Sequence, residues 1–265
     1  MIKFENAEVI GFEAAIRGMR NPMNSWEKGD SGWDAHVPPL ELRNQVDWER
    51  WAEHYKTVEY NDEYTYDVGP NDQDLMTRLR NAGTDHRKFM RMITVYVDIT
   101  APLYWWKEFD TYKVGTVANS CSTMHKIADK EFTLDDFSHE HLGFQSTRVL
   151  KDVIKIMNDF REEFLKDHEK DNWWQMIQLL PSSYNQRRTV MLNYEVLANI
   201  YKSRKNHKLD EWHTFCGWIE TLPYSELITG QSSKNIPICD DMVEANNRIG
   251  NINAISAEEL KEDKK

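Results

Sequence analysis

The sequence has few cysteines and no long apolar run. Its three cysteines, Cys121, Cys216 and Cys239, form no CxxC pair, and an odd number makes a poor disulfide framework. We therefore expect reduced thiols and a cytoplasmic protein. No apolar run approaches the roughly 18 residues that a membrane span requires, and the opening residues lack the apolar segment of a secretory signal. These absences predict a protein with no membrane contact.

Positive charge is also scarce. The chain has 33 Lys and Arg against 44 Asp and Glu, a net charge of −11. A protein that binds nucleic-acid polymers through their phosphates needs a basic surface, so this balance argues against such a partner. A small anionic ligand remains open, because a few local cations can form a pocket in an acidic protein.

The short motifs with established chemistry are missing: the sequence contains no GxGxxG, P-loop, GxSxG or HExxH. His139 and His141 could offer two imidazoles, but no cysteine pair or third ligand accompanies them. We expect a solvated loop there and no metal site.

The 265 residues, with 40% hydrophobic content, predict one large domain. We place it at residues 1–255 and expect the charged residues 256–265 to fray. Residues 22–70 are rich in tryptophan and acids and look like an insertion, with a possible helix over 40–55 after two prolines.

In the first half, residues 5–20 predict a short strand and a helix, and Asn71 predicts the N-cap of a helix to Leu79. The alternation over 93–99 predicts a strand. Pro102 suits the first position of a helix to Phe109, and a polar loop follows over 111–122.

The second half predicts helices over 149–164 and 189–203, and a third from Trp212 that ends before Pro223. The tryptophan pairs 105–106 and 173–174 predict core positions, although they could also stack on a flat ligand. Together these patterns predict an α+β fold, with a central antiparallel or mixed sheet flanked by long helices.

Three places carry residues that could act together: His86 ahead of the strand, the loop over 109–122, and the predicted helix that carries Asn193, Asn199 and Arg204. Asn193 and Arg204 are eleven residues apart, so on one helix they would share a face about 16 Å apart. A nucleotide-sized ligand could lie along that face. The alternative is that these are helix-surface polar residues without a function.

The order of these residues resembles the flavin-dependent thymidylate synthases. That family has Gly-His before a strand, Ala-Pro at a helix opening, an RHRxxSxNExSxR loop, Leu-Pro, and a helix reading NxRSLxNFLxLR. The matching positions here are His86, Ala101-Pro102, the loop from Thr111 to Thr123, Leu180-Pro181, and Asn193, Leu197, Asn199 and Arg204. The resemblance covers residues 75–222 and, more weakly, 5–20.

This chain departs from the family pattern mainly at arginines. Thr111-Tyr112-Lys113 stands for Arg-His-Arg, Thr123 for the final arginine of the loop, and Glu195 for the arginine of the last helix. The family's arginines hold phosphates, and lysine does not replace their paired contacts. Either other cations supply the charge or the ligand differs; the candidates are Arg87, Arg91, Arg187 and Arg188.

The resemblance implies a homotetramer with sites between subunits, FAD as cofactor, and methylation of dUMP to dTMP. Methylenetetrahydrofolate would donate the carbon, and a reduced nicotinamide, NADPH, the electrons. Arg204 would bind and polarise the pyrimidine.

The resemblance also implies roles for the remaining matched residues. His86, Asn193 and Asn199 would contact flavin, and Tyr112 and Lys113 would lie on the flavin-facing loop. Ser122 would bind the dUMP phosphate, with Asn119 also on the substrate side. The missing arginines favour an alternative, in which the fold binds a nucleotide or flavin with altered specificity or without catalysis.

Overall fold

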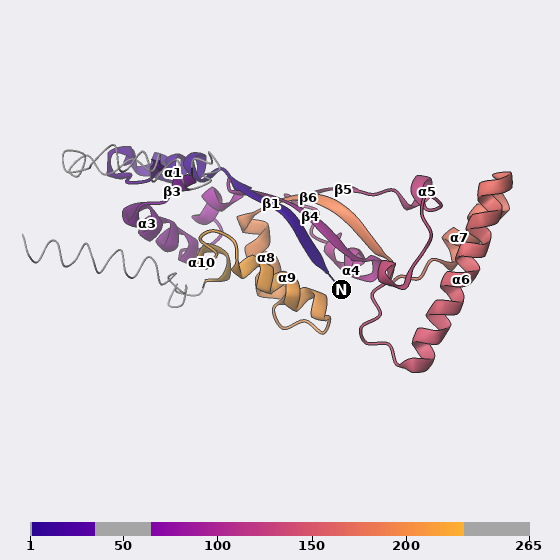
Figure 1. Ribbon diagram of the computed structural model, residues 1–265. Coiled ribbons are helices and arrows are strands. Elements are labelled where there is room, and N and C mark those ends of the chain that lie inside the picture. Colours follow the sequence, from indigo (N-terminus) through magenta and orange to yellow (C-terminus); the bar gives the residue numbers. More distant parts are fainter. Residues whose placement is uncertain (1, 35–64, 231–265) are drawn as a thin grey trace, which may run out of the picture. The chain divides into compact units, whose positions relative to one another are not determined.

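A four-stranded antiparallel sheet lies at the centre of the computed structural model, which describes residues 2–34 and 65–230 (Figure 1). Its order is β1-β4-β6-β5. The strands are β1 (Lys3–Ile10), β4 (Thr94–Pro102), β5 (Val117–Ser120) and β6 (Asn185–Asn193). With helices around this sheet, the α+β prediction is confirmed.

Helices alternate with the strands along the chain. They are α1 (Phe12–Arg20), α3 (Pro70–Asn81), α4 (Leu103–Phe109), α5 (Thr123–Lys126), α6 (Phe144–Asp167), α7 (Lys170–Leu179), α8 (Tyr194–Arg204), α9 (Asp210–Glu220) and α10 (Glu226–Thr229). Single 3₁₀ turns are η1 (Asn21–Met23), η2 (Trp26–Lys28), η3 (Arg87–Arg91) and η4 (Leu134–Asp136). Within the described residues, no helix is both long enough and apolar enough to span a membrane.

The main core lies between one face of the sheet and helices α4, α8 and α9. Val95, Val97 and Ile99 of β4 are buried while Tyr96 between them is exposed, so the predicted alternation is confirmed. Trp105 and the other buried residues of α4 pack against this face together with α8 and α9. The predicted core position of the 105–106 pair is therefore confirmed.

Two predictions about β5 and β6 were wrong. The helix predicted over 189–203 begins only at Tyr194, because Asn185–Asn193 pairs with β4 on one side and β5 on the other. The loop predicted over 111–122 contains strand β5, whose residues are all exposed. Exposure removes the hydrophobic alternation that would identify an edge strand, so only the pairing with β6 defines it.

Two predicted helix starts shift by one or two residues. Gly69, not Asn71, is the N-cap of α3, with Pro70 as its first residue. Pro102 ends β4 and caps α4, so Leu103 is the first helical residue. The extended backbone at Gly69 and Pro102 places both outside their helices.

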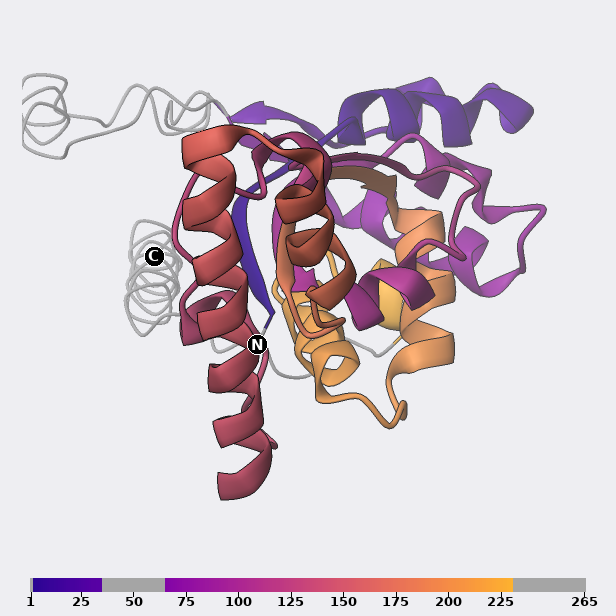
Figure 2. The ribbon, with the colours of Figure 1, turned by 90° about the vertical axis from the view of Figure 1, so that its right-hand side faces the viewer.

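A second, smaller core joins α6 and α7, which lie side by side (Figure 2). Ile154 and Met157 of the predicted 149–164 stripe are buried in it, but Val149 is 62% exposed. Trp173 packs partly against this core, whereas Trp174 is 40% exposed, so the core prediction for the 173–174 pair is wrong for its second residue.

The two described ends of the 22–70 segment meet in a small sheet, β2 (Gly32–Asp34) paired with β3 (Thr65–Asp67). The predicted helix over 40–55, Cys239 and the predicted tail over 256–265 lie outside the described residues. Cys121 and Cys216 are free thiols, as predicted.

Candidate functional site

Arg204, the last residue of α8, meets the end of α4 and the loop that follows it. Its Nε donates a hydrogen bond to the Tyr112 hydroxyl over 2.8 Å, and its Nη1 donates to Oε2 of Glu108 over 2.8 Å. The guanidinium also lies over the Trp212 ring, 4.7 Å from its centroid. Three elements therefore fix this side chain.

The same Glu108 oxygen accepts a second hydrogen bond, from Nε1 of the buried Trp212 over 2.8 Å. His207 Nε2 lies 3.4 Å from it. The Arg204 side chain is 18% exposed and that of Glu108 34%, so the pair is partly open to solvent. We call Glu108, Tyr112, Arg204, His207 and Trp212 the Arg204 cluster.

A second cluster joins η3 to α8 next to the predicted His86. Arg87 Nη2 donates to Oε1 of Glu195 over 3.0 Å and to Oδ1 of Asn199 over 3.3 Å, and Arg87 Nε lies 2.8 Å from Oε2 of Glu195. Glu195 is buried, and Arg87 supplies its counter-charge. At position 195, where the resemblance implies an arginine, this chain has an acid that pairs with Arg87 of η3.

Asn193 does not share one helical face with Arg204 as predicted. It is the N-cap of α8 with an extended backbone, and its Oδ1 accepts from the Val196 amide over 3.0 Å. Gly115 in the preceding loop has a left-handed backbone, and a Cβ there would lie 3.0 Å from Asn193 Nδ2. The loop that carries the exposed Lys113 therefore packs closely on the start of α8.

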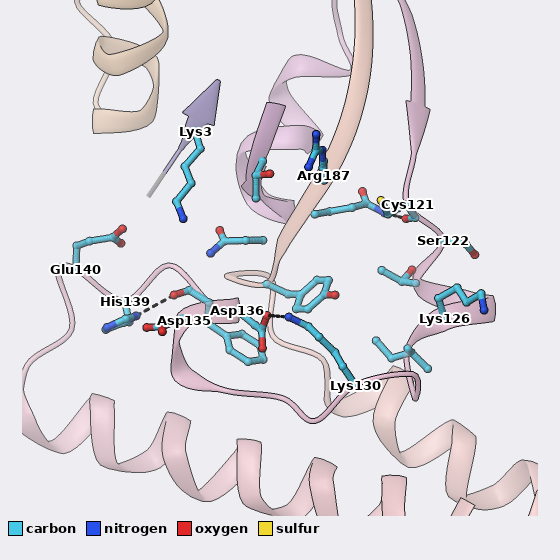
Figure 3. Close-up of a pocket in the computed structure, with 17 residues that line it drawn as sticks. Lys3, Cys121, Ser122, Lys126, Lys130, Asp135, Asp136, His139, Glu140 and Arg187 are labelled. Carbon is cyan, nitrogen blue, oxygen red and sulfur yellow. Dashed lines mark hydrogen bonds and ion pairs between the residues drawn. The ribbon is translucent and has the colours of Figure 1, made fainter. Parts of the chain in front are cut away.

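A cavity of about 500 Å³ lies where β1 and β6 begin and the chain leaves β5 (Figure 3). Its lining includes Ser122, Lys3, Lys126 and Arg187, together with the Lys130–Asp136 ion pair. Ser122 is the N-cap of α5 and accepts from the His125 amide over 3.1 Å. We call this cavity the Ser122 pocket.

Charged groups at this pocket are held by hydrogen bonds. Burial alone would raise the pKa of Asp136, but hydrogen bonds from Lys130 and Thr133 outweigh it and hold the pKa below its ordinary value. Arg187 Nη2 donates to Asp98 over 2.7 Å. Hydrogen bonds from Thr189, Arg187 and Asn6 hold the pKa of Asp98 well below its usual range.

The structure therefore distributes the predicted site residues over separate groups. Tyr112 and Arg204 are bonded to each other, Asn199 joins Arg87 beside His86, and Ser122 lines the pocket. Asn119 lies on β5, paired with Thr189 of β6, outside the pocket lining. Three groups are separate: the Arg204 cluster, the second cluster of Arg87, Glu195 and Asn199, and the Ser122 pocket. Within residues 2–34 and 65–230, no hydrogen bond or ion pair links any two of them.

Two groups that hold Arg204 were not predicted from the sequence. They are the Glu108 carboxylate and the Trp212 indole. Glu108 stands four residues before Tyr112, in the last turn of α4, and Tyr112 is in the loop that follows this helix. No local pattern marks Glu108, because its role depends on α4, α8 and α9 meeting in space.

The two candidate imidazoles have other partners. His139 Nδ1 lies 2.8 Å from the Phe137 carbonyl oxygen, and His141 Nε2 lies 3.1 Å from Asp210. Among the residues that the structure describes, no three His, Cys, Asp or Glu side chains form a group that could hold a metal ion.

Comparison with known proteins identifies the fold. No protein-family model matches the chain, and no curated protein matches its sequence. Two solved structures of the flavin-dependent thymidylate synthase ThyX from Helicobacter pylori, both with FAD and dUMP, are similar with TM-scores of 0.54 and 0.55 at 13% identity. They cover 85% and 86% of this chain and 97% and 96% of their own.

A UMP/dUMP methylase, PolB from Streptomyces cacaoi bound with 5-Br UMP, matches 68% of this chain and 87% of its own, with a TM-score of 0.46 and 13% identity. The ThyX structures establish that this chain has the flavin-dependent thymidylate synthase fold. The resemblance inferred from the motifs is thereby confirmed for the fold, with a sequence that has diverged far from those structures.

Proposed function

We propose that the chain methylates dUMP to dTMP with FAD as cofactor, methylenetetrahydrofolate as carbon donor and NADPH as reductant. The shared fold supports this proposal. The observation that carries it is the 2.8 Å hydrogen bond between Arg204 and Tyr112. These two residues come from separate motifs 92 positions apart, and the fold brings them together at one site.

Arg204 would polarise the pyrimidine. Its Nε and Nη1 donate to Tyr112 and Glu108, while its Nη2 has no hydrogen-bond partner among the described residues. That nitrogen can donate to a carbonyl oxygen of the base as negative charge builds there. A donor already held in place stabilises the transition state more than the ground state.

The phosphate of dUMP would lie in the Ser122 pocket. Ser122 and the cations Lys3, Lys126 and Arg187 line it, beside the acids Asp135, Asp136 and Glu140, and these cations would take the place of the family arginines that this chain lacks. Asn119, just upstream on β5, remains a proposed substrate contact. A volume of about 500 Å³ is in the range of small-molecule sites.

The residues that would hold FAD offer suitable donors. Asn193 and Asn199 each use the side-chain oxygen within the chain, which leaves both amide nitrogens without a hydrogen-bond partner in the described residues. Two such nitrogens, with the exposed His86 and Lys113, fit the polar edge and phosphates of a flavin nucleotide. Bound FAD would supply the hydride chemistry that the side chains lack.

The resemblance implies that residues of more than one copy complete the site. The Arg204 cluster and the Ser122 pocket are separate groups among the described residues, and one nucleotide would contact both. A homotetramer with sites between subunits would supply them together. Light scattering should then give about four times 31.4 kDa.

Two acidic residues favour the alternative of altered specificity or a binding role without catalysis. Glu195 replaces a family arginine, and Glu108 neutralises Arg204. In that case the protein would bind a flavin or a pyrimidine nucleotide without forming dTMP.

The test begins with the colour and the flavin absorbance of the purified protein. The apoprotein is then titrated with FAD while flavin fluorescence is followed, and dTMP formation is measured with each co-substrate omitted in turn. Saturable FAD binding and dUMP-dependent dTMP formation would support the proposal. FAD binding without dTMP formation would support the alternative. The absence of saturable FAD binding would exclude both the FAD-dependent methylation and a flavin-binding role without catalysis.

A further inference from the structure

The polarising cation of the proposed site lies against a carboxylate. Oε2 of Glu108 accepts from Arg204 Nη1 and from Trp212 Nε1, both over 2.8 Å. A pyrimidine nucleotide is an anion, and an acid beside the cation that should bind it works against that attraction. We therefore look for a role of Glu108 other than attracting the nucleotide.

Glu108 restricts how Arg204 can bind a ligand. A guanidinium holds phosphate best through two parallel N–H bonds. Here Nε donates to Tyr112, Nη1 donates to Glu108, and the flat face lies over Trp212. Among the described residues only Nη2 lacks a partner altogether. A ligand that also approached the second N–H of Nη1 would come close to the Glu108 carboxylate, so Nη2 is the nitrogen placed for a single neutral carbonyl oxygen.

The charge of the pair leads to the same conclusion. Arg204 and Glu108 together are neutral, and both are partly exposed. A phosphate approaching Nη2 would meet the Glu108 carboxylate nearby, whereas a neutral carbonyl would meet no comparable repulsion. The lining of the Ser122 pocket holds four cations, Lys3, Lys126, Lys130 and Arg187, against three acids, Asp135, Asp136 and Glu140. Its excess of one positive charge favours phosphate more than the neutral Arg204–Glu108 pair does.

We propose that Glu108 is a positioning and specificity-determining residue that aims Arg204 Nη2 at one neutral carbonyl oxygen and excludes phosphate from Arg204. The carbonyl part rests on the proposed function. The exclusion of phosphate does not depend on methylation, so the two can fail separately.

The test uses the full-length protein and inorganic phosphate in isothermal titration calorimetry. Glu108→Gln keeps an oxygen that can accept from Arg204 and Trp212 but removes the negative charge. We expect Glu108→Gln to bind phosphate at Arg204 at least about tenfold more tightly than wild type does there, as a binding step additional to the one at the Ser122 pocket; tenfold is the effect of one good charge-assisted contact. In Glu108→Gln/Arg204→Met this gain should disappear.

The matched control is Glu163→Gln on α6, which makes the same change in net charge. Glu163 is exposed, and in the part of the chain that the structure describes it pairs only with Lys166, over 3.0 Å. Its replacement should leave phosphate affinity at the wild-type value. An equal gain in this control would mean that net charge alone explains the effect, and it would overturn the proposal.

Arg204→Met in the wild-type background tests the proposal even if Glu108→Gln folds poorly. Because phosphate is excluded from Arg204, this variant should bind phosphate as wild type does. A loss of phosphate affinity would overturn the proposal, as would unchanged affinity in folded Glu108→Gln or a gain that survives Arg204→Met.

Steady-state kinetics with dUMP separates positioning from a structural role. Glu108→Ala, which removes the oxygen that Glu108→Gln keeps, should lower kcat more than it raises KM, because the guanidinium that has lost this acceptor stabilises the transition state less well. An unchanged kcat would overturn the positioning role. If wild type forms no dTMP, the proposed function fails, while the phosphate titrations still decide whether Glu108 excludes anions.

Discussion

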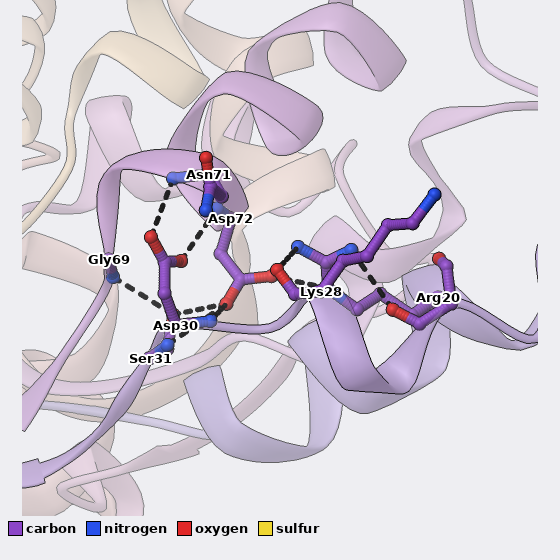
Figure 4. A network of polar contacts seen from close by, with 8 residues as sticks. Arg20, Lys28, Asp30, Ser31, Gly69, Asn71 and Asp72 are labelled. Carbon is purple, nitrogen blue, oxygen red and sulfur yellow. Dashed lines mark hydrogen bonds and ion pairs between the residues drawn. The ribbon is translucent and has the colours of Figure 1, made fainter.

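Two helices of this protein, α1 and α8, each end on an arginine that faces a carboxylate, and the two arginines are held very differently. Arg20 donates through Nε to Asp72 over 2.6 Å, through Nη1 to the Ser25 carbonyl over 3.2 Å, and through Nη2 to the Lys28 carbonyl over 3.0 Å (Figure 4). Arg204 uses only Nε and Nη1.

The difference extends to the carboxylates and to water. Asp72 is 0% exposed and also accepts from the Ser31 hydroxyl and from the amides of Asp30 and Ser31. Glu108 is 34% exposed, and from the described residues it accepts through one oxygen only. A buried ion pair is tolerated when every polar atom has a partner, so the Arg20 pair is structural, whereas the open Arg204 pair can accept a ligand.

The largest effect should come from breaking the Arg20 pair. Arg20→Met leaves Asp72 buried without its cation, and breaking a buried pair from one side costs about 3–5 kcal/mol. The free energy of unfolding from urea titration measures this loss. Arg78→Met is the control, because its ion pair with Asp74 is exposed and contributes less than about 0.5 kcal/mol.

Equal losses in Arg20→Met and Arg78→Met would contradict the structural role. In the folded protein the Arg20 network holds residues 20–31 against α3. Arg20→Met should therefore also speed proteolysis within residues 22–31.

The sequence predicted the elements whose burial follows a regular pattern. β4 and α9 were found because their apolar residues repeat at the periods of a strand and a helix. The sequence predicts the second half of β6 as the start of a helix, although Val190 and Leu192 are buried and alternate. Its pairing with β4 and β5, which are distant in sequence, decides its conformation, and no local pattern shows that pairing.

The candidate site was predictable only in part, for the same reason. The order of the motifs predicted Tyr112 and Arg204 as site residues, and in the structure the two are hydrogen-bonded to each other. It gave no indication that Glu108 would hold Arg204 or that Arg87 would pair with Glu195, since both contacts depend on how α8 packs against α4 and η3.

The next effect concerns activity. Arg204→Ala removes the proposed polarising donor and should lower dUMP turnover ~10²–10³-fold, roughly 3–4 kcal/mol of transition-state stabilisation. Because the side chain is partly exposed, the loss of stability should be only about 1–2 kcal/mol, from two hydrogen bonds. Arg204→Lys should recover activity in part, since lysine lacks the planar fork.

Turnover with dUMP and melting temperature, measured on the same preparations, check this prediction. Arg20→Met is the opposite control, because it should lower the melting temperature most while the surviving folded fraction retains turnover. Wild-type turnover in Arg204→Ala would contradict the proposed mechanism, and only the assignment of the fold would still stand.

A smaller effect depends on pH. Burial alone would raise the pKa of Asp72, but hydrogen bonds from Ser31, Arg20 and the Asp30 amide outweigh it and hold the pKa below its ordinary value of 3.8. A carboxyl whose pKa is lowered by folding contributes stability above its unfolded pKa and loses it as the pH falls through the folded value.

Comparison of wild type with Asp72→Asn isolates this contribution. The difference in free energy of unfolding should stay constant from about pH 7 to pH 5 and shrink below about pH 4, where the unfolded carboxyl begins to bind protons. Urea titrations across this range provide the measurement. A difference that stays constant down to the lowest pH would mean that folding leaves the pKa of Asp72 unchanged.

The smallest effect should come from Tyr112→Phe, which removes only the oxygen that accepts from Arg204 Nε. One neutral acceptor contributes about 1 kcal/mol, so turnover should fall by roughly tenfold or less, well short of the loss in Arg204→Ala. The aromatic ring, whose centroid lies 5.5 Å from the guanidinium, is retained.

Tyr201→Phe is the matched control, since that hydroxyl on α8 donates to Glu220 over 2.6 Å and makes no hydrogen bond to the described residues of the Arg204 cluster. Both variants should lose similar stability, but only Tyr112→Phe should lose turnover, because only its hydroxyl fixes the direction of the guanidinium. Equal turnover in the two variants would show that Glu108 and Trp212 hold Arg204 without Tyr112.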